Sequence, residues 1–397
     1  MDNKLKTIVI LSAIISLFLL IMIFQVLLSG PKYDLNDIVE IIPVTQNENN
    51  WPMFRGSQEL LGIAQGQLPD SLEFLWRFKT DGGIKSSPVI DSNIVYVGSN
   101  DDNIYAIDLY TGDKVWSYKT DDSVEAPPLC INGMVYAGSL GGFFYAIDAN
   151  SGEFKWKYET DGSIYGAANW TYSPDKKSIW IIVGSYDNFL YCFNFANGKL
   201  VWKYESDNFI NGSTAIEDQT VVFGGCDEVI HAISLTNGNQ IAKIEDVSNI
   251  AASAAILDGQ VYVGNYNNVF LKADIKSEKI LWEYTESDAP FFSSPAIGED
   301  YIIVGSRDEH VHCIGRNDGK KIWTFTTLGE VDSSPVICGD KVIFGSEDGN
   351  IYMIRLSDGS QVWSYEIGQG VNSSPAVAQG MVVIGCDDGY VYAFGTK

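Results

Sequence analysis

Basic residues are scarce in this sequence of 397 residues, because 26 Lys and Arg stand against 51 Asp and Glu and give a formal charge of −25. Such a surface repels a phosphate backbone, so nucleic acid is not an expected partner. Histidine is rarer still, with three residues in the chain. Few histidines are therefore available for a hydrolase triad or a histidine-based metal site.

Cysteine is present but unpatterned. The six cysteines form no C-x-x-C motif and no adjacent pair, which argues against a metal ribbon or a disulfide framework. In the register of the repeat described below, Cys192 and Cys313 take the place of Ala106, and Cys386 takes that of Ser99. We therefore expect small buried thiols that fill core positions.

Long hydrophobic runs are absent except at residues 7–29, where 23 residues carry no charge. As a helix this run would be about 34 Å long, enough to cross the hydrocarbon core of a bilayer. It is too long for the apolar part of a signal peptide, and no cysteine suited to lipid attachment follows it. We expect an uncleaved single-pass anchor in the membrane.

The charges around this run set its orientation. Lys4 and Lys6 precede it and acidic residues follow it, so residues 1–6 are predicted to be cytoplasmic. Residues 30–50 form a polar tether. The remainder of the chain would then lie in a periplasmic or extracellular compartment.

From residue 72 onward the chain repeats one unit, which Ser86 to Trp116 shows most clearly. This stretch has four short segments rich in β-branched and aromatic residues, separated by turns that contain Gly, Asp and Asn. That is the pattern of a propeller blade, which must stack against copies of itself to bury both faces. The aligned position in the fourth segment is Trp76, Trp116, Trp156, Trp202, Ala242, Trp282, Trp323 and Trp363. We expect the large indole of this position to fill the seam between neighbouring blades.

The two ends of the repeat complete each other. Leu72 to Lys79 reads as a fourth segment, but the three segments that should precede it are missing. Ser373 to Phe394 contains the first three segments of a unit, but the fourth is missing. Pairing them removes an open sheet edge. We predict an all-β, eight-bladed β-propeller at 72–397, closed by an N-terminal strand and preceded by a lead-in segment at 51–71 and the one transmembrane helix. Seven blades is the alternative, because the unit from Ile210 to Ala242 lacks its Trp.

The repeat also resembles a known family. Ala106 to Trp116, AIDLYTGDKVW, is echoed by Ala146 to Trp156, AIDANSGEFKW. These segments resemble the tryptophan-docking repeat of the pyrroloquinoline-quinone (PQQ) propeller superfamily, and the resemblance covers 51–397, including the lead-in WPMFRG. It implies one of two functions. One branch holds calcium- and PQQ-dependent quinoprotein dehydrogenases, and the other is a non-catalytic branch that includes the barrel-assembly lipoprotein BamB.

One candidate ligand-binding residue follows each of the aligned tryptophan positions, by nine residues or by ten in the sixth unit. Together these residues would form a ring. We expect each to open the innermost strand and to line the channel mouth, the usual place for a ligand in this fold. The ring consists of Lys85, Glu125, Tyr165, Asn211, Ala251, Phe292, Asp332 and Asn372.

The quinoprotein branch implies a Glu, an Asn and an Asp around calcium and PQQ, for which Glu125, Asn211 and Asp332 are the candidates. Calcium needs about six to eight oxygen ligands, and three residues of common types do not specify a site. We therefore predict no catalytic residue, no metal and no cofactor, with PQQ and calcium as the alternative.

Acidic residues gather in the loops that enter each blade and in the hairpins between its second and third strands, which share one end of the propeller. They are Asp81, Asp101, Asp102, Asp121, Asp122, Asp161, Asp187, Asp227, Glu228, Asp308, Glu309, Asp348, Asp387 and Asp388. The opposite end carries Lys114, Lys176, Lys177, Lys199, Lys279, Lys320, Lys321 and Lys341. We hypothesise an acidic face that attracts a cationic ligand or a basic protein. The alternative is that Asp is simply a good turn former.

The preferred function is a membrane-anchored scaffold that presents a propeller face to envelope or surface proteins and has no chemistry of its own. A quinoprotein oxidoreductase is the second hypothesis. A lectin-like binder is the third, because Tyr165, Trp170 and Phe292 are aromatic residues suited to stacking on sugars and fall near the predicted mouth.

Overall fold

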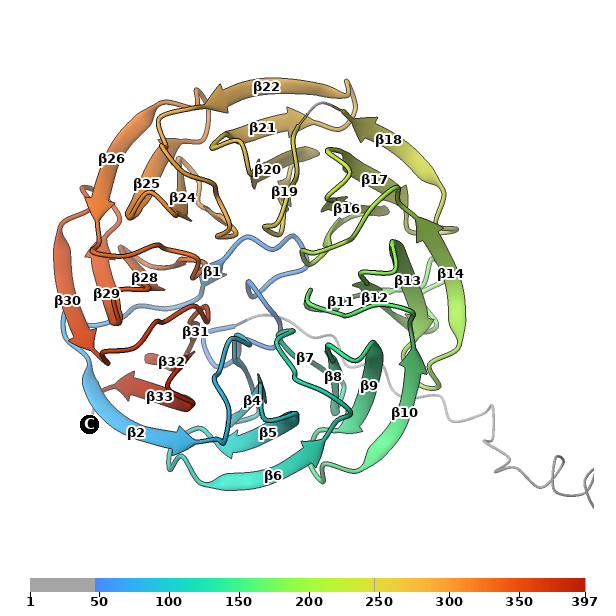
Figure 1. Ribbon diagram of the computed structural model, residues 1–397, viewed down its shortest axis with the longest axis horizontal. Coiled ribbons are helices and arrows are strands. Elements are labelled where there is room, and N and C mark those ends of the chain that lie inside the picture. The colour runs from blue at the N-terminus through green and yellow to red at the C-terminus, as the bar shows by residue number, and fades with distance from the viewer. Residues whose placement is uncertain (1–46, 246, 397) are drawn as a thin grey trace, which may run out of the picture. The chain divides into compact units, whose positions relative to one another are not determined.

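The structure is a computed structural model that describes residues 47–245 and 247–396. In these residues eight sheets surround a central axis, each with four antiparallel strands that follow one another from the axis to the rim, and one of the sheets has an additional short strand at the axis (Figure 1). The predicted eight-bladed propeller is confirmed, and the seven-bladed alternative is wrong. The blade without its Trp is a complete sheet of four paired strands, and Ala242 keeps the buried position of the tryptophan on its outer strand.

Blades 1 to 4 follow one another along the chain, and in each of them the strands run in sequence order from the axis outward. Blade 1 contains β3 (Val89–Asp91), β4 (Ile94–Ser99), β5 (Asn103–Asp108) and β6 (Lys114–Lys119). Blade 2 contains β7 (Leu129–Ile131), β8 (Met134–Gly138), β9 (Phe143–Asp148) and β10 (Phe154–Glu159). Blade 3 contains β11 (Asn169–Tyr172), β12 (Ile179–Gly184), β13 (Phe189–Asn194) and β14 (Leu200–Glu205). Blade 4 contains β15 (Ala215–Glu217), β16 (Thr220–Gly224), β17 (Ile230–Ser234) and β18 (Gln240–Ile244).

Blades 5 to 8 complete the ring. Blade 5 contains β19 (Ala255–Leu257), β20 (Gln260–Gly264), β21 (Phe270–Asp274) and β22 (Lys279–Tyr284). Blade 6 contains β23 (Ala296–Ile297), β24 (Tyr301–Ser306), β25 (His310–Gly315) and β26 (Lys321–Thr326). Blade 7 contains β27 (Val336–Cys338), β28 (Lys341–Gly345), β29 (Asn350–Arg355) and β30 (Gln361–Glu366). Blade 8 contains β31 (Ala376–Ala378), β32 (Met381–Gly385), β33 (Tyr390–Gly395) and, as its outer strand, β2 (Glu73–Lys79).

The ring is closed by the pairing of β2 with β33. The two strands are antiparallel, from Glu73 opposite Gly395 to Lys79 opposite Tyr390. This is the predicted closure by an N-terminal strand. Because the first and last parts of the chain share one sheet, blade 8 forms only when both ends are in place.

The predicted anchor at 7–29, the segment 1–6 and most of the tether at 30–50 lie outside the described residues. Within 47–245 and 247–396, no helix is long and apolar enough to cross a membrane.

The lead-in segment closes one end of the central channel. Its Trp51 pairs with Ile90 of blade 1, and the short strand β1 (Ile63–Ala64) runs parallel to β27 of blade 7. Between these points, backbone N–H groups of the innermost strands donate to lead-in carbonyls. The pairs are Cys130 with Pro52, Ile216 with Gln58, Ile256 with Glu59, Ile297 with Leu61 and Ile337 with Gly62.

The remaining two blades are joined to the same part of the chain. The Gln58 side chain donates to the Trp170 carbonyl of blade 3, and the Gln379 N–H of blade 8 donates to the Glu48 carbonyl at 2.6 Å. The innermost strands would otherwise expose unpaired edges at the axis. Residues 48–64 therefore form hydrogen bonds with the innermost part of all eight blades. They close this end of the channel, which becomes a cup that is open at the other end.

Arg55 fixes the lead-in at the centre of the ring. It is 1% exposed, and its Nη atoms donate to the carbonyls of Ser334, Pro295 and Pro335 at 2.6–3.1 Å. Burial lowers the pKa of Arg55 to about 9, so the guanidinium is still charged at neutral pH. A Cβ at Gly62 would lie 1.9 Å from Arg55 Nη2, so only glycine fits beside it.

We expect Arg55→Ala to lower the free energy of unfolding by about 2–5 kcal/mol, because three buried carbonyls would lose their donor. Urea unfolding followed by tryptophan fluorescence measures this. The matched control is Arg77→Ala, since Arg77 lies on β2 over the exposed side of the Tyr390 ring and should contribute less than about 1 kcal/mol. Equal losses in the two variants would contradict the role of Arg55.

The docking tryptophans join neighbouring blades, as predicted. Trp76 of blade 8 lies against Gly112 of blade 1, and its Nε1 donates to the Leu109 carbonyl at 2.8 Å. The same hydrogen bond recurs at Trp116, Trp156, Trp202 and Trp323, at 2.9–3.1 Å. At six seams a Cβ on the turn glycine would lie 2.5–2.8 Å from the indole ring. A side chain at this turn position is therefore incompatible with the tryptophan.

The seam between blades 4 and 5 has lost both partners. Ala242 stands in place of the tryptophan, and Glu278 stands at the turn position where six other seams have glycine. Glu278 has a φ of 54°, so the turn keeps its left-handed geometry without a glycine. The two replacements belong together, because a Cβ is tolerated at the turn only when no indole ring packs on it.

We therefore predict strong coupling between residues 242 and 278. Ala242→Trp alone should destabilise the ring, because the indole meets the Glu278 side chain. The double variant Ala242→Trp/Glu278→Gly should recover the stability, with a coupling energy of about 1–3 kcal/mol. A double-mutant cycle measured by urea unfolding checks this, and additive effects would show that the two positions are independent.

Candidate functional site at the channel mouth

The predicted ring lies at the open end of the channel but not on the strands. Each member precedes its innermost strand by four residues, as Lys85 precedes β3 at Val89 and Asp332 precedes β27 at Val336. The expectation that these residues open the strands is therefore wrong. They belong to the loops that enter the blades, because the small residues that follow them are needed where eight chains crowd around the axis.

Seven of the eight ring positions line one cavity. Its volume is about 210 Å³, and Phe54 of the lead-in also contributes to its lining. The ring residues in the lining are Lys85, Glu125, Tyr165, Asn211, Ala251, Phe292 and Asp332, while Asn372 is outside it. A cup of this size is below the range of about 300–1,000 Å³ in which most small-molecule sites fall.

A belt of serines forms the wall of the cup below the ring. The backbone N–H of Ser213 donates to the Ser253 hydroxyl of the next blade at 2.8 Å. Equivalent bonds begin at Ala167, Ser253, Ser294, Ser334 and Ser374, the last of them reaching Ser87 of blade 1. The belt is interrupted at Pro127, which has neither an N–H nor a hydroxyl. The recurring Ser-Ser-Pro of the sequence was the signal for this belt, and the sequence reasoning missed it.

The charged ring residues form salt bridges, Lys85 with Glu125 of the ring and Asp332 with Arg307, which follows β24. Lys85 Nζ lies 3.5 Å from Glu125 Oε1, which also accepts from Asn100 Nδ2 at 3.2 Å. Arg307 binds Asp332 through Nε and Nη2 at 2.9 and 2.6 Å. These contacts hold the side chains in place along the rim of the cup.

The three candidates for a calcium and PQQ site are engaged in this way. Asn211 accepts from the Tyr186 hydroxyl at 2.6 Å and donates to the Ala251 carbonyl at 3.1 Å. Glu125 is bonded to Lys85, and Asp332 is bonded to Arg307. Among the described residues, no group of three or more His, Cys, Asp or Glu side chains could hold a metal ion. In this arrangement Glu125 and Asp332 each form a salt bridge and Asn211 is hydrogen-bonded to Tyr186, so all three candidates have protein partners.

Two carboxylates that form no salt bridge within the described part of the chain, Glu347 and Asp387, lie beside Asn372, although the charge of Lys85 acts on Asp387. Asn372 Nδ2 donates to Glu347 Oε1 at 2.6 Å and to Asp387 Oδ2 at 3.0 Å. Burial raises the pKa of Asp387, and the charge of Glu347 raises it further. One amide group thus holds two acidic side chains together at the mouth.

Aromatic side chains occupy the other part of the mouth. Tyr165 and Tyr186 have ring centroids 4.6 Å apart, and Tyr186 is stacked on Phe209 at 4.9 Å. Tyr266 meets Phe292 at 4.8 Å, and the Arg307 guanidinium lies 3.6 Å from the Phe292 centroid. Trp170, a candidate for sugar stacking in the sequence, is buried on β11 and is not part of this surface.

Tyr186, Phe209 and Tyr266 were missed by the sequence reasoning. Tyr186 and Tyr266 follow the second strand of their blades, where other units have Asn100, Leu140, Cys226, Arg307, Glu347 and Asp387. The residue type at this position varies from blade to blade as strongly as it does at the ring position. Aligning the residues that follow the second strand of each unit would therefore have identified Tyr186 and Tyr266.

The acidic side chains of this end serve the fold in part. The hairpin carboxylate of Asp101 accepts from the Tyr105 hydroxyl at 2.8 Å and from the Asp81 N–H at 2.9 Å, which joins two successive blades. Tyr191, Tyr352 and Tyr392 make the same bond to Asp187, Asp348 and Asp388, and His231 and His312 take the tyrosine's place beside Asp227 and Asp308. Hydrogen bonds within the propeller therefore account for many of these acidic residues.

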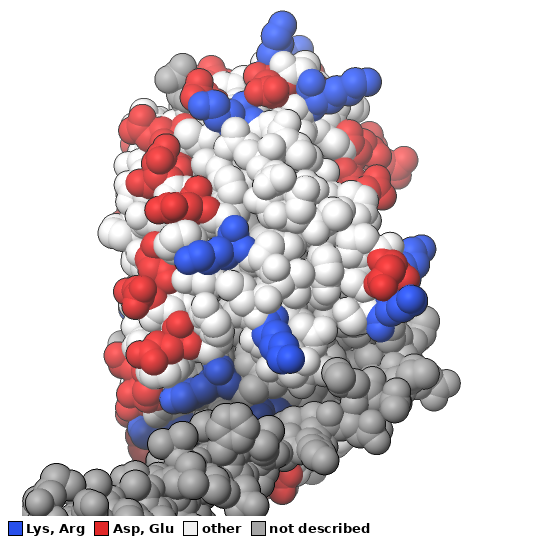
Figure 2. Space-filling model, turned by 90° about the vertical axis from the view of Figure 1, so that its right-hand side faces the viewer, with Lys and Arg blue, Asp and Glu red and all other residues white. Residues whose placement is uncertain are grey.

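The charge of the wall and its edges is visible from the side. Figure 2 shows acidic side chains along one edge of a largely uncharged wall, with basic and acidic groups mixed at the other edge. On the lysine-bearing end, Lys320 lies 3.2 Å from Asp318, and Lys341 lies 2.9 Å from Asp70. Several of the lysines that were expected to make this end basic are thus neutralised locally.

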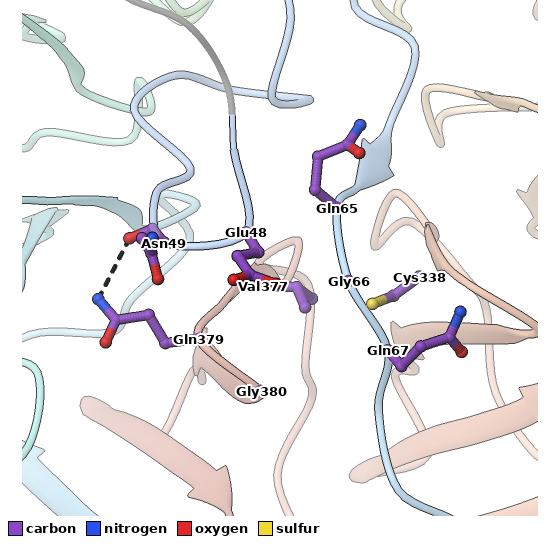
Figure 3. Close-up of a pocket in the computed structure, with 9 residues that line it drawn as sticks. All are labelled: Glu48, Asn49, Gln65, Gly66, Gln67, Cys338, Val377, Gln379 and Gly380. Carbon is purple, nitrogen blue, oxygen red and sulfur yellow. Dashed lines mark hydrogen bonds between the residues drawn. The ribbon is translucent and has the colours of Figure 1, made fainter.

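A second cavity of about 320 Å³ lies on the lead-in side, between the lead-in and blades 7 and 8. Figure 3 shows Glu48, Gln65, Gln67 and Gln379 around it, with the Gln379 amide bonded to the Asn49 carbonyl at 3.2 Å. Burial raises the pKa of the Cys338 thiol in its lining to about 11, so the thiol is protonated and unreactive at neutral pH.

Comparison with protein families identifies the repeat. The sequence model of the family described as "Outer membrane protein assembly factor BamB" matches residues 73–173, 125–325 and 280–397. The chain belongs to this BamB family. The predicted resemblance to PQQ-like propellers and their BamB-like branch is confirmed. No curated protein sequence matches the chain.

Solved structures share the fold of this BamB-family propeller. BamB from Moraxella catarrhalis is 18% identical with a TM-score of 0.68, covering 82% of this chain and 100% of its own. The quinohemoprotein alcohol dehydrogenase of Comamonas testosteroni is 13% identical with a TM-score of 0.74, covering 87% and 80%. The computationally designed Ika8 protein is 17% identical with a TM-score of 0.71, covering 83% and 100%. A fold shared by such different proteins does not define a function, which has to be argued from the site.

The hairpin aspartates predict a pH dependence of stability. Burial raises the pKa of Asp101, but hydrogen bonds from Asn103, Tyr105 and the Asp81 N–H outweigh it and lower the pKa below its usual 3.8. The carboxylate therefore stabilises the fold above pH 3.8, and this contribution is lost as the pH falls through the lowered pKa.

We expect Asp101→Asn to lower the free energy of unfolding by about 1–3 kcal/mol at pH 7, because the Tyr105 hydroxyl and the N–H groups of Asp81 and Asn103 lose a charged acceptor. The difference from wild type should shrink below pH 3.8. Urea unfolding at pH 7, 5 and 3 measures it. Asp102→Asn is the matched control in the same hairpin, since Asp102 pairs with the exposed Lys119 and should cost less than about 1 kcal/mol at every pH. A constant difference for Asp101→Asn would disprove the linkage.

Proposed function

We propose that the protein is a non-catalytic scaffold of the cell envelope, which presents the mouth face of its propeller to other proteins. The observation that carries this proposal is the state of the mouth itself. The ring residues Glu125 and Asp332 form salt bridges with Lys85 and Arg307, while aromatic side chains beside them are left exposed. Paired charges hold a surface in shape, and exposed aromatics give it area for contact.

Membership of the BamB family supports the same function. The family description names a factor in outer membrane protein assembly, a task carried out by contacts between proteins. The proposed location is outside the cytoplasm, with residues 7–29 as a single-pass anchor and residues 1–6 on the cytoplasmic side. This follows from the sequence of that segment and the positive-inside rule.

Capture of partners from solubilised membranes tests the scaffold. The full-length chain is used as bait, and the bound proteins are identified by mass spectrometry. We expect envelope proteins to be enriched over a bait that carries the destabilising variant Arg55→Ala. Recovery of the same proteins with both baits would show non-specific binding and count against the proposal.

A quinoprotein oxidoreductase is the competing function, favoured by the fold shared with the quinohemoprotein alcohol dehydrogenase. Addition of PQQ and calcium to the full-length chain, followed by equilibrium dialysis and a dye-linked assay with alcohols and sugars, separates the two. We expect neither retention of PQQ nor dye reduction, because Glu125, Asn211 and Asp332 have protein partners. Stoichiometric PQQ binding would overturn the scaffold proposal.

A further inference from the structure

The mouth face is divided into two sectors of different chemistry. The aromatic arc comprises Tyr165, Tyr186, Phe209, Tyr266 and Phe292, from blades 3 to 6 and the loops that enter them. The acidic arc comprises Glu330, Asp332, Glu347, Asp387 and Glu125, from blades 7 and 8 and the loops that enter blades 7 and 2. In Figure 1 the aromatic arc belongs to the blades at the right and top, and the acidic arc to those at the left and bottom.

The aromatic arc has the exposure of a contact surface. Phe209 is 45% exposed and Tyr266 is 41% exposed, although both side chains are large and aromatic. The Tyr186 hydroxyl is anchored on Asn211, so the Tyr186 and Phe209 rings are held in place before any partner arrives. Rigid aromatic side chains lose little conformational entropy on binding, which makes them effective anchors in interfaces.

The acidic arc has more negative charge than its cations can neutralise. It contains five carboxylates, and the cations beside them are Lys85 and Arg307. Arg307 is shared between Glu330 and Asp332, at 3.2 and 2.6 Å, and Lys85 lies beside Glu125. Glu347 and Asp387 have the neutral amide of Asn372 as their common donor. An incoming cation would therefore find its strongest attraction at this pair.

The size of the cup argues against a free ligand of cofactor size. About 210 Å³ is too small to enclose most cofactors, and Glu347 and Asp387 lie outside its lining, so a partner that contacts both arcs binds across the rim. We propose that the mouth is a docking surface for a protein segment that presents Lys or Arg beside an aromatic or large aliphatic residue. The basic side chain lies on the Glu347 and Asp387 side, and the apolar residue packs on the aromatic arc.

This inference rests on the proposed scaffold function and names the chemistry of its partner. An array of ten-residue peptides tests it directly, with four classes that are basic and aromatic, basic alone, aromatic alone, or acidic and aromatic. The full-length chain in detergent should bind the basic and aromatic class at least tenfold more strongly than the other three. The advantage over the aromatic class should shrink at 1 M salt, because screening weakens exposed charges.

Matched variants assign the binding to the two arcs. Phe209→Ala and Tyr266→Ala should each reduce binding at least fivefold, whereas Phe154→Ala, an equally exposed Phe on β10 at 49%, should not. Glu347→Gln should reduce the preference for basic peptides, whereas Glu366→Gln on β30 of the same blade should not. Glu347→Lys should shift the preference toward acidic peptides, a gain that misfolding cannot imitate.

Three results would overturn the inference: equal binding of the four peptide classes, wild-type binding by both Phe209→Ala and Tyr266→Ala, or binding of oligosaccharides that depends on Phe209.

The scaffold proposal is tested independently of this surface. Capture of envelope proteins that is unchanged in Phe209→Ala would leave the scaffold standing and remove this surface. Peptide binding without capture of any envelope protein would remove the scaffold and leave the surface.

Discussion

The structure depends on a contact that recurs at six seams, between a docking tryptophan and the turn glycine of the following blade. A blade is a short twisted sheet with two apolar faces, and it is stable only between two neighbours. The indole ring fills the wedge at the rim, and its N–H satisfies a carbonyl of the next blade. The seam between Ala242 and Glu278 shows that the contact is a pair, since both members are replaced together. The pairing of β2 with β33 then closes the ring.

The lead-in segment stabilises the propeller at its axis, where the innermost strands would lack hydrogen-bond partners. Innermost strands have an unpaired edge, and eight such edges meet in the channel. Residues 48–64 pair with all of them and place Arg55 on carbonyls of blades 6 and 7. The consequence for function is that one end of the channel is blocked and only the other end can receive a ligand. The polarity of the molecule is thus set by where the chain enters the propeller.

Function is concentrated where the repeat varies. Positions that recur from blade to blade, such as the hairpin aspartates and the serine belt, are bonded within the propeller and explain its cohesion. Positions that differ, in the ring and directly after the second strand, form the aromatic and acidic arcs. Many of the acids in these loops are structural, so the overall charge of −25 says less about a partner than the few carboxylates around Asn372 do.

The sequence by itself determined the all-β class, the number of blades, their register and the closing strand, because a repeated unit with two apolar faces has few ways to bury them. It also named the ring around the mouth, although it placed those residues on strands where the crowding at the axis puts them in loops. Tertiary structure decided which ring residues pair, as Arg307 with Asp332, since those partners are about 25 residues apart and meet only between neighbouring blades. It also decided that the lead-in blocks one end, because the backbone groups that hold it become neighbours only after the ring has formed.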